Sequence, residues 1–258
     1  VRLRGQQLPD CRPGLQAAAM NTYHYDLHIH SCLSPCGDND MTPNNLVQMA
    51  LLSGCDVIAL TDHNTCRNAP AAMEAGARNG LLVIPGMELC TAEEAHVVWL
   101  FETLEGALEF DHYIYENMPH VKNRPEIFGE QRLLDGEDAP VGEEENLLLV
   151  SSFVGVDQVV GLAAQYGGVA FPAHVDRDSF SVIASLGAIP AEAGFTAAEV
   201  TRDCDLASFT QLHPELGGLP IFRDSDSHYL ETLAGDPWEL PLPELSIQAV
   251  LDAVRGRN

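Results

Sequence analysis

The sequence predicts an α/β protein built as one barrel-like domain, and two observations lead to this fold class. Short apolar runs alternate with helical stretches from Tyr23 onward, a pattern typical of βα units around a largely parallel sheet. The 258 residues, of which 46% are hydrophobic, can also bury a sizeable core. We expect residues 23–258 to form this domain, preceded over residues 1–22 by an N-terminal arm without clear periodicity.

Three strands and two helices are expected in the first third of the chain. The apolar runs predict strands over 25–29, 56–60 and 81–86. Thr42 and Pro43 provide an N-cap and a first-turn proline for a helix that ends at Gly54. A second helix begins after Asn68 and ends at Gly80.

The next strand breaks the simple alternation. Seven residues separate Glu88 from His96, too few for a parallel crossover, so the strand over 96–101 should return antiparallel. This return would bring the start of that strand beside the end of the one before it.

The second half of the chain contains an acidic excursion and then resumes the alternation. A helix is expected over 104–117, and residues 119–146 follow with eight acids, three bases and a hairpin turn signal at Asp135–Gly136. We interpret this segment as a hairpin-like excursion over the surface. Further strands are expected over 169–175, 197–201 and 220–222, with helices over 156–166, 179–187 and 206–213 and a last helix from Ser246.

Charge and composition argue against several classes of function. The 38 acidic and 13 basic residues give a net charge of −25, which argues against a long nucleic acid held through its backbone. No apolar run is long enough to span a bilayer and no secretory signal is visible, so we expect no membrane partner and a cytoplasmic location. The seven cysteines, an odd number spread along the chain, predict reduced thiols.

Two pairs of candidate metal ligands stand at the ends of predicted strands. His28 and His30 close the strand over 25–29, and because side chains alternate along a strand, both imidazoles should point the same way. Asp226 and His228 have the same spacing after the short apolar run over 220–222. Either pair alone would equally suit ordinary hydrogen-bonded polar residues. A barrel, however, builds its site from the loops that follow its strands, which favours a shared site.

The other candidates occupy equivalent positions. His63, Glu88 and His174 follow predicted strands, and His96 would join them through the antiparallel return. We expect Asp62 to orient a ligand rather than to bind a metal itself.

Histidine and carboxylate ligands together suit zinc, iron or manganese, and the number of histidines implies two or three divalent ions. Glu88 is the expected bridge between two of them, beside a hydroxide that attacks phosphorus.

Six motifs resemble, in order, those of the PHP (polymerase and histidinol phosphatase) family of metal-dependent phosphoesterases. They are DLHIHS (26–31), LTDHNT (60–65), PGMEL (85–89), HVVWLF (96–101), PAHVDR (172–177) and SDSH (225–228). The resemblance implies a distorted, TIM-like (βα)7 barrel with a trinuclear metal centre at the C-terminal ends of its strands. It implies three ligand sets: His28, His30, Glu88 and Asp226; His63 and Glu88; and His96, His174 and His228.

One ligand position departs from the family pattern. Many members place an aspartate or histidine seven or eight residues after the first histidine of the HxH pair, where this chain has Cys36. A Cys36 thiolate would favour zinc or iron over manganese. Asp38 or Asp40 could serve instead, and Cys36 could equally be a turn residue without a metal role.

A phosphate group needs cationic partners, and few are available. Arg177 is the first choice as a catalytic and phosphate-binding residue, since an arginine fork matches phosphate oxygens. Arg202, Arg223 and, less favourably, Arg67 are further candidates, and each could equally be an ion-paired surface residue.

The leading hypothesis is therefore a metal-dependent phosphoesterase that hydrolyses a small phosphate ester, either a phosphomonoester or a nucleotide-like molecule. Catalysis would rest on Glu88, Asp62 and Arg177. A nuclease acting on short oligonucleotides is one alternative. A metal-dependent amidohydrolase, or a catalytically silent metal-binding module, is another. No long nucleic acid is expected as a partner.

Overall fold

The computed structural model describes residues 20–233 and 235–257 and has the α/β architecture that the sequence predicts. Residues 1–19 of the expected N-terminal arm lie outside the described residues. The first strand begins earlier than expected, at Asn21, because its first residues pair with a strand near the C-terminus. The strands are β1 (Asn21–Ile29), β2 (Val57–Leu60), β3 (Leu82–Cys90), β4 (His96–Phe101), β5 (Arg132–Leu134), β6 (Pro140–Glu143), β7 (Gly168–Pro172), β8 (Ala198–Val200), β9 (Ile221–Arg223) and β10 (Trp238–Leu242).

Six of these strands form one sheet in the order β10-β1-β2-β3-β4-β7. The strands β1, β2 and β3 are parallel, as expected for βα units. The strand β4 is antiparallel to both of its neighbours, which confirms the predicted hairpin return. Its register pairs Cys90 with His96, so the start of β4 lies beside the end of β3. The hairpin therefore brings His96 to the edge where the parallel strands end.

A full (βα)7 barrel is not what the strands form. The sheet curls into a half-barrel, and β8 and β9 make a separate parallel pair of three-residue strands. Backbone contacts link this pair to the sheet on both sides: Val175 N donates to Glu199 O at 2.9 Å, and His30 N donates to Ser227 O at 3.0 Å. The expected distorted (βα)7 barrel is thus matched only in part, because β8 and β9 are too short to extend the ladder of the six-stranded sheet.

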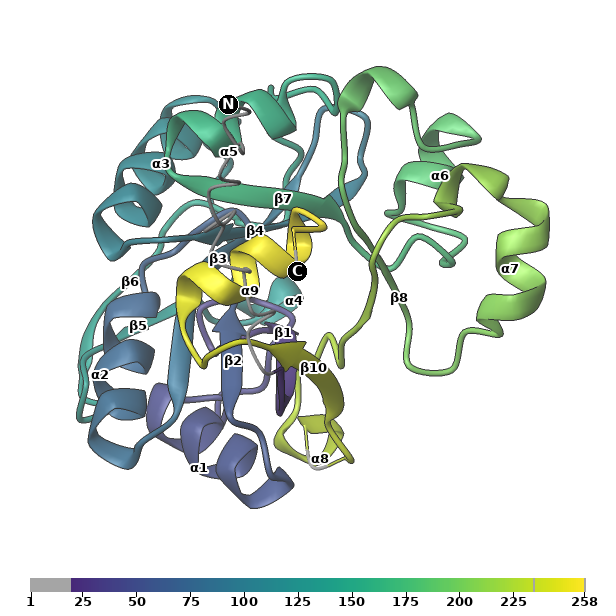
Figure 1. Ribbon diagram of the computed structural model, residues 1–258. Coiled ribbons are helices and arrows are strands. Elements are labelled where there is room, and N and C mark those ends of the chain that lie inside the picture. Colours follow the sequence, from purple (N-terminus) through teal and green to yellow (C-terminus); the bar gives the residue numbers. More distant parts are fainter. Residues whose placement is uncertain (1–19, 234, 258) are drawn as a thin grey trace, which may run out of the picture.

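Helices surround the curled sheet (Figure 1). They are α1 (Pro43–Ser53), α2 (Ala69–Asn79), α3 (Leu104–Glu116), α4 (Pro125–Phe128), α5 (Val159–Gln165), α6 (Val182–Leu186), α7 (Leu206–Leu212), α8 (Leu230–Leu233) and α9 (Ile247–Val254), with two 3₁₀ turns at Ala191–Ala193 and Pro214–Leu216. The ends of α1 match the sequence signals: the side chain of Thr42 accepts from Asn45 N, and Gly54 has the left-handed φ of 90° that ends the helix. No helix in the described part of the chain has both the length and the hydropathy needed to cross a bilayer.

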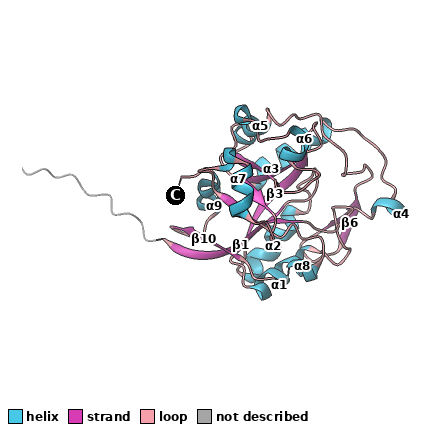
Figure 2. Ribbon diagram, turned by 90° about the vertical axis from the view of Figure 1, so that its right-hand side faces the viewer, coloured by secondary structure: helices cyan, strands magenta, loops and turns pink. Residues whose placement is uncertain are grey.

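The acidic segment over 119–146 contains α4 and the β5–β6 hairpin, which lie at one end of the molecule (Figure 2). The predicted turn is present, since Asp135 N donates to Ala139 O at 3.0 Å. The segment is also anchored to the domain: Arg132 N donates to Cys32 O at 3.0 Å, and the hydroxyl of Thr42 donates to Asp138 at 2.6 Å. The excursion thus packs on the loop after β1 and on the start of α1.

Candidate metal centre

The carboxylate of Glu88 lies at the centre of a buried group of imidazoles. It is fully buried on β3, and five imidazole nitrogens lie within 3.4 Å of its oxygens. Oxygen Oε1 faces His28 Nε2 at 3.3 Å, His96 Nδ1 at 2.8 Å and His174 Nε2 at 3.1 Å; oxygen Oε2 faces His30 Nε2 at 3.4 Å and His63 Nδ1 at 2.8 Å. The two oxygens thus face different histidines, which is the arrangement that a bridging carboxylate needs.

A second carboxylate, Asp226, closes the group from the loop after β9. Its Oδ1 lies 3.3 Å from His28 Nε2 and 3.1 Å from His30 Nε2. Its backbone has a φ of 49°, in the left-handed region that non-glycine residues seldom adopt. The His28 and His30 Nε2 atoms lie 3.2 Å apart, so both imidazoles of β1 point to the same place.

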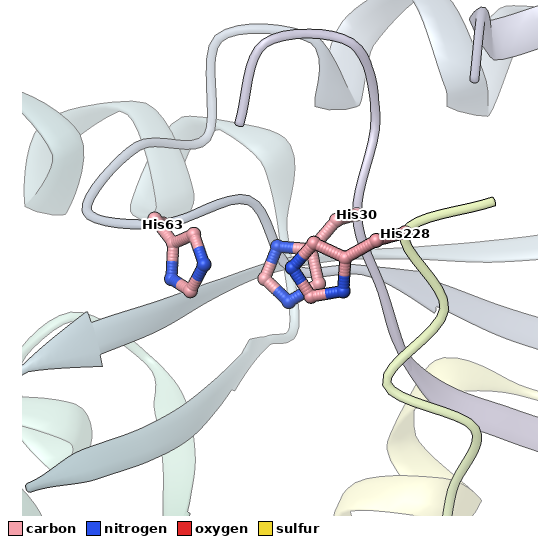
Figure 3. Close-up of side chains that lie close together, drawn as sticks. All are labelled: His30, His63 and His228. Carbon is pink, nitrogen blue, oxygen red and sulfur yellow. The ribbon is translucent and has the colours of Figure 1, made fainter. Parts of the chain in front are cut away.

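Three groups of side chains have ligand atoms within 4.8 Å of one another and could each hold a metal ion. They are His28, His30, Glu88 and Asp226; His63, Glu88 and His96; and His30, His63 and His228. Figure 3 shows the third group, whose imidazoles come from three separate segments and gather around a common space. The first group equals the expected first ligand set. The expected set of His96, His174 and His228 does not recur among these groups of described residues, because His228 lies beside His30, with ring centroids 4.2 Å apart.

The chemistry of the group fits divalent cations. Glu88 Oε2 and Asp226 Oδ1 are buried without a hydrogen-bond partner, although buried carboxylate oxygens normally have one. Burial, with His228 and His63 nearby, lowers the pKa of His30 well below its usual value, so its imidazole is neutral and offers a lone pair. Buried lone pairs that face one another are satisfied by a cation, and this mixture of nitrogen and oxygen suits zinc, iron or manganese.

A buried glutamate that the sequence analysis did not single out supports two of the histidines. Glu199 on β8 places its Oε2 at 2.8 Å from His28 Nδ1, and its Oε1 accepts from His174 N at 3.3 Å. Metal-binding histidines commonly use their second nitrogen for such a carboxylate contact, which fixes the tautomer and the ring orientation. The available signal was an acid within an apolar strand pattern, AAEVT.

Asp62 contacts serines rather than imidazoles. It accepts from Ser31 N at 2.7 Å and from the hydroxyls of Ser31 and Ser34 at 2.6 and 2.7 Å. The Ser34 Oγ lies 3.0 Å from His30 Nδ1 and accepts from His63 N at 3.1 Å. Asp62 therefore reaches two candidate ligands through one serine.

Cys36 lies at the edge of the candidate centre. It shares the wall of a cavity with His63 and His96, but it belongs to none of the three groups found among the described residues. Burial, with a contribution from Glu88, raises the pKa of its thiol to about 12. Asp38 and Asp40 are exposed and also stand outside these groups, with Asp38 accepting from Asp40 N at 2.8 Å.

Of the four candidate arginines, Arg177 is the one that contacts a residue of these groups. Its guanidinium lies 2.7 Å from Asp226 Oδ2, and its side chain is 44% exposed. The other three hold partners elsewhere: Arg223 donates to the carbonyls of Thr201, Arg202 and Cys204, Arg202 lies 4.4 Å over the Trp238 ring, and Arg67 pairs with Glu144. The sequence shows which arginines follow strands, but not which carbonyls or rings those arginines meet.

Similar proteins of known structure share this fold. The lesion-specific endonuclease PfuEndoQ from Pyrococcus furiosus aligns with a TM-score of 0.65 and 16% identity, over 92% of this chain and 57% of that one. Endonuclease Q has also been crystallised with a 27-mer duplex carrying an abasic lesion at the active site. A Bifidobacterium adolescentis protein assigned as a metal-dependent phosphoesterase aligns with a TM-score of 0.53 and 18% identity, over 79% of this chain and 87% of that one.

A curated relative matches a shorter stretch at higher identity. The 5'-3' exoribonuclease Rnm of Salmonella typhimurium is 41% identical over 76 residues, which are 29% of this chain. The matched stretch spans about a quarter of that relative, 25% of its length.

These relatives overturn one expectation. We expected the charge of −25 to exclude long nucleic acids, and that exclusion is wrong, because a relative is named an exoribonuclease and a structural neighbour was crystallised with a DNA duplex. The physical reason is that a net charge describes the whole surface, whereas cations at a site set the local potential that a phosphate meets.

The family model of the PHP domain matches residues 26–185. This stretch carries seven of the nine candidate ligands: His28, His30, Cys36, His63, Glu88, His96 and His174. The match covers more than half of the chain and agrees with the order of motifs, with the fold and with the buried histidine–carboxylate groups. The chain therefore belongs to the PHP domain family.

Proposed function

We propose that this protein is a metal-dependent phosphoesterase that hydrolyses phosphodiester bonds of nucleic acids. The observation that carries the proposal is the Glu88 carboxylate, whose two oxygens face five imidazoles in a buried site. The family supports a metal-dependent hydrolase, and the exoribonuclease relative favours a nuclease over our first expectation of a small phosphate ester.

The residues would hold two or three divalent cations. His28, His30, Glu88 and Asp226 would hold one, and His63, Glu88 and His96 another, with His228 completing a third group beside His30 and His63. Cations bound here would supply Lewis acidity and neutralise charge on phosphoryl oxygens. Glu88 would keep two of them at a fixed separation, while Glu199 and Asp62 hold the orientation of the histidines.

Arg177 would bind the phosphate. One guanidinium nitrogen is paired with Asp226, which fixes the side chain next to the candidate ligands, and its 44% exposure leaves other donors accessible. An arginine held in this way can donate to two phosphoryl oxygens and offset charge that develops in the transition state.

The test is a hydrolysis assay of the protein reconstituted in turn with zinc, iron and manganese. The panel is a 5'-phosphorylated RNA oligomer, the matching DNA, a set of small phosphomonoesters and a set of amides. We expect cleavage of the RNA oligomer, and Glu88→Gln should abolish that cleavage while Glu94→Gln, an exposed acid in the same hairpin, retains it. Turnover confined to small phosphomonoesters or to amides would refute the nuclease assignment.

A further inference from the structure

A small cavity opens beside the candidate metal centre, and its walls are mostly apolar. It has a volume of about 230 Å³ and is lined by Cys36, His63, Cys90, His96, Leu148, Leu149 and Phe180. Pockets that hold a drug-sized molecule measure roughly 300–1,000 Å³, so this cavity suits one flat ring system rather than a whole chain of nucleotides. Two of its walls, His63 and His96, are candidate metal ligands, so a ring in the cavity would lie next to the reacting phosphate.

Phe180 presents a fixed aromatic face at this cavity. Its side chain is 51% exposed, and its ring stacks on His96 with centroids 5.1 Å apart and planes 30° from parallel. Its backbone has a φ of 54°, which is uncommon for a bulky residue, and its carbonyl accepts from His96 N at 2.9 Å. The loop between β7 and α6 therefore holds the exposed ring of Phe180 in a fixed position beside His96.

The part of the wall that Leu148 forms is also held by hydrogen bonds. Asn64, which follows His63 directly, donates from its side-chain amide to Leu148 O at 2.8 Å and to Val150 O at 2.7 Å. Its side-chain oxygen accepts from Cys90 N at 2.9 Å. One buried amide thus joins the loop that carries Leu148 to both the metal motif and the end of β3, and the cavity is already formed without a ligand.

The side chains that line the cavity indicate which chemical class of ligand it binds. Its lining, as far as the structure describes the chain, contains no lysine or arginine, so no ammonium or guanidinium group is there to bind a phosphate. A flat, largely apolar group would instead be matched by the Phe180 ring and by the two leucines.

From these observations we infer that the cavity binds the base of the nucleotide whose phosphate lies at the metal centre, with Phe180 as the stacking platform. The inference rests on the proposed function and specifies how that function is directed to one nucleotide. Stacking uses the flat face that every base has, so the cavity accepts all four bases with little discrimination. In a chain with a net charge of −25, this stacking contact also supplies binding that does not depend on lysine or arginine.

The experiment compares Phe180→Leu with Phe153→Leu, a matched change at another exposed phenylalanine that does not line the cavity. The substrates are two short RNAs that differ only in whether the terminal nucleotide has a base. We expect Phe180→Leu to raise KM for the intact RNA roughly 5- to 150-fold, the range expected for loss of one stacked base. KM for the RNA with an abasic terminus should stay unchanged, and Phe153→Leu should match the unmodified protein on both.

A binding measurement separates this inference from the proposed function. Metal-stripped protein is titrated by calorimetry with a nucleoside monophosphate and with ribose 5-phosphate, which lacks the base. We expect preference for the nucleoside monophosphate, and we expect Phe180→Leu to remove it. If RNA is cleaved while Phe180→Leu behaves as Phe153→Leu in both experiments, the base site is wrong and the nuclease assignment stands. If the protein shows the base preference in calorimetry but cleaves no nucleic acid, the nuclease assignment fails and the cavity remains a base site.

Discussion

The candidate ligands fall into two sets that the fold supports differently. His28, Glu88 and His96 lie on strands of the six-stranded sheet, where backbone ladders determine their positions. His174 and Asp226 lie in loops with φ values of 29° and 49°, next to the short β8–β9 pair. The second set depends on side-chain contacts: Glu199 accepts from His174 N, and Arg177 pairs with Asp226. The sheet backbone therefore positions one set of candidate ligands, whereas a few buried carboxylates and one arginine position the other.

Replacement of Glu88 should have the largest effect, because this residue joins both sets. Glu88→Gln keeps the shape of the side chain but removes the charge that faces five imidazoles. We expect hydrolysis to fall by more than the roughly 10- to 100-fold typical of residues that only support a ligand. Steady-state turnover measures this loss, and a melting curve should show a smaller change in stability. Near-normal turnover would show that Glu88 is no bridge.

Replacement of Glu199 tests how far the centre depends on this carboxylate, which contacts His28 of the first set and His174 of the second. Glu199→Gln removes the charged partner of His28 Nδ1, and we expect metal affinity or hydrolysis to fall roughly 10- to 100-fold. Glu239→Gln, an exposed glutamate on β10, is the matched control and should have no effect. Metal titration followed by calorimetry measures the affinity. An unchanged affinity in Glu199→Gln would mean that the charge of Glu199 is not needed to position His28 or His174.

Removal of metal should destabilise the loop-borne set more than the sheet-borne set. A cation present at about 100 times its Kd stabilises the folded state by ~2.7 kcal/mol, which for a protein of this size lowers the melting temperature by roughly 5–11 °C when a chelator removes it. Amide hydrogen exchange should then rise first over 173–181 and 223–229, whereas β2 and β3 stay protected. Equal exchange in both sets would show that the loops are held as firmly as the sheet.

Replacement of Cys36 should have the smallest effect. The three groups of ligands are complete without it, so Cys36→Ser should keep the metal content and lose less than the tenfold in turnover typical of a supporting residue. Alkylation sharpens the test. A thiolate bound to metal resists the reagent until the metal is stripped, whereas a protonated thiol at the cavity wall reacts equally in both states. Loss of one ion per chain in Cys36→Ser would make the cysteine a ligand, as the family position suggests.

The sequence predicts well where the side chains of the sheet-borne set lie, and also where the side chain of His30 lies, a residue that follows β1 directly. The two-residue period of a strand puts His28 and His30 on one side, and the seven residues between Glu88 and His96 require an antiparallel return. Both follow from local geometry, so no coordinates are needed.

The remaining features depend on contacts between distant segments. Glu199 meets His28 across 171 residues of sequence, and Arg223 meets three carbonyls whose positions depend on how β8 and β9 lie together. The net charge led to a wrong prediction about nucleic acids for a similar reason. It sums the charges of the whole chain, whereas the site occupies a small part of the surface. These features reflect tertiary packing, which a pattern along the chain does not contain.

The single amide of Asn64 determines which parts of the cavity can change over evolution. It holds the wall loop through the carbonyls of Leu148 and Val150, which every amino acid possesses, and not through their side chains. The side chain of Leu149, which is 38% exposed, can therefore be exchanged without displacing His63 or the rest of the centre, whereas Leu148 is buried in the core. The metal centre can in this way stay in place while exposed wall residues change the substrate preference, and a library limited to Leu149 and Phe180 would sample that range at little cost to folding.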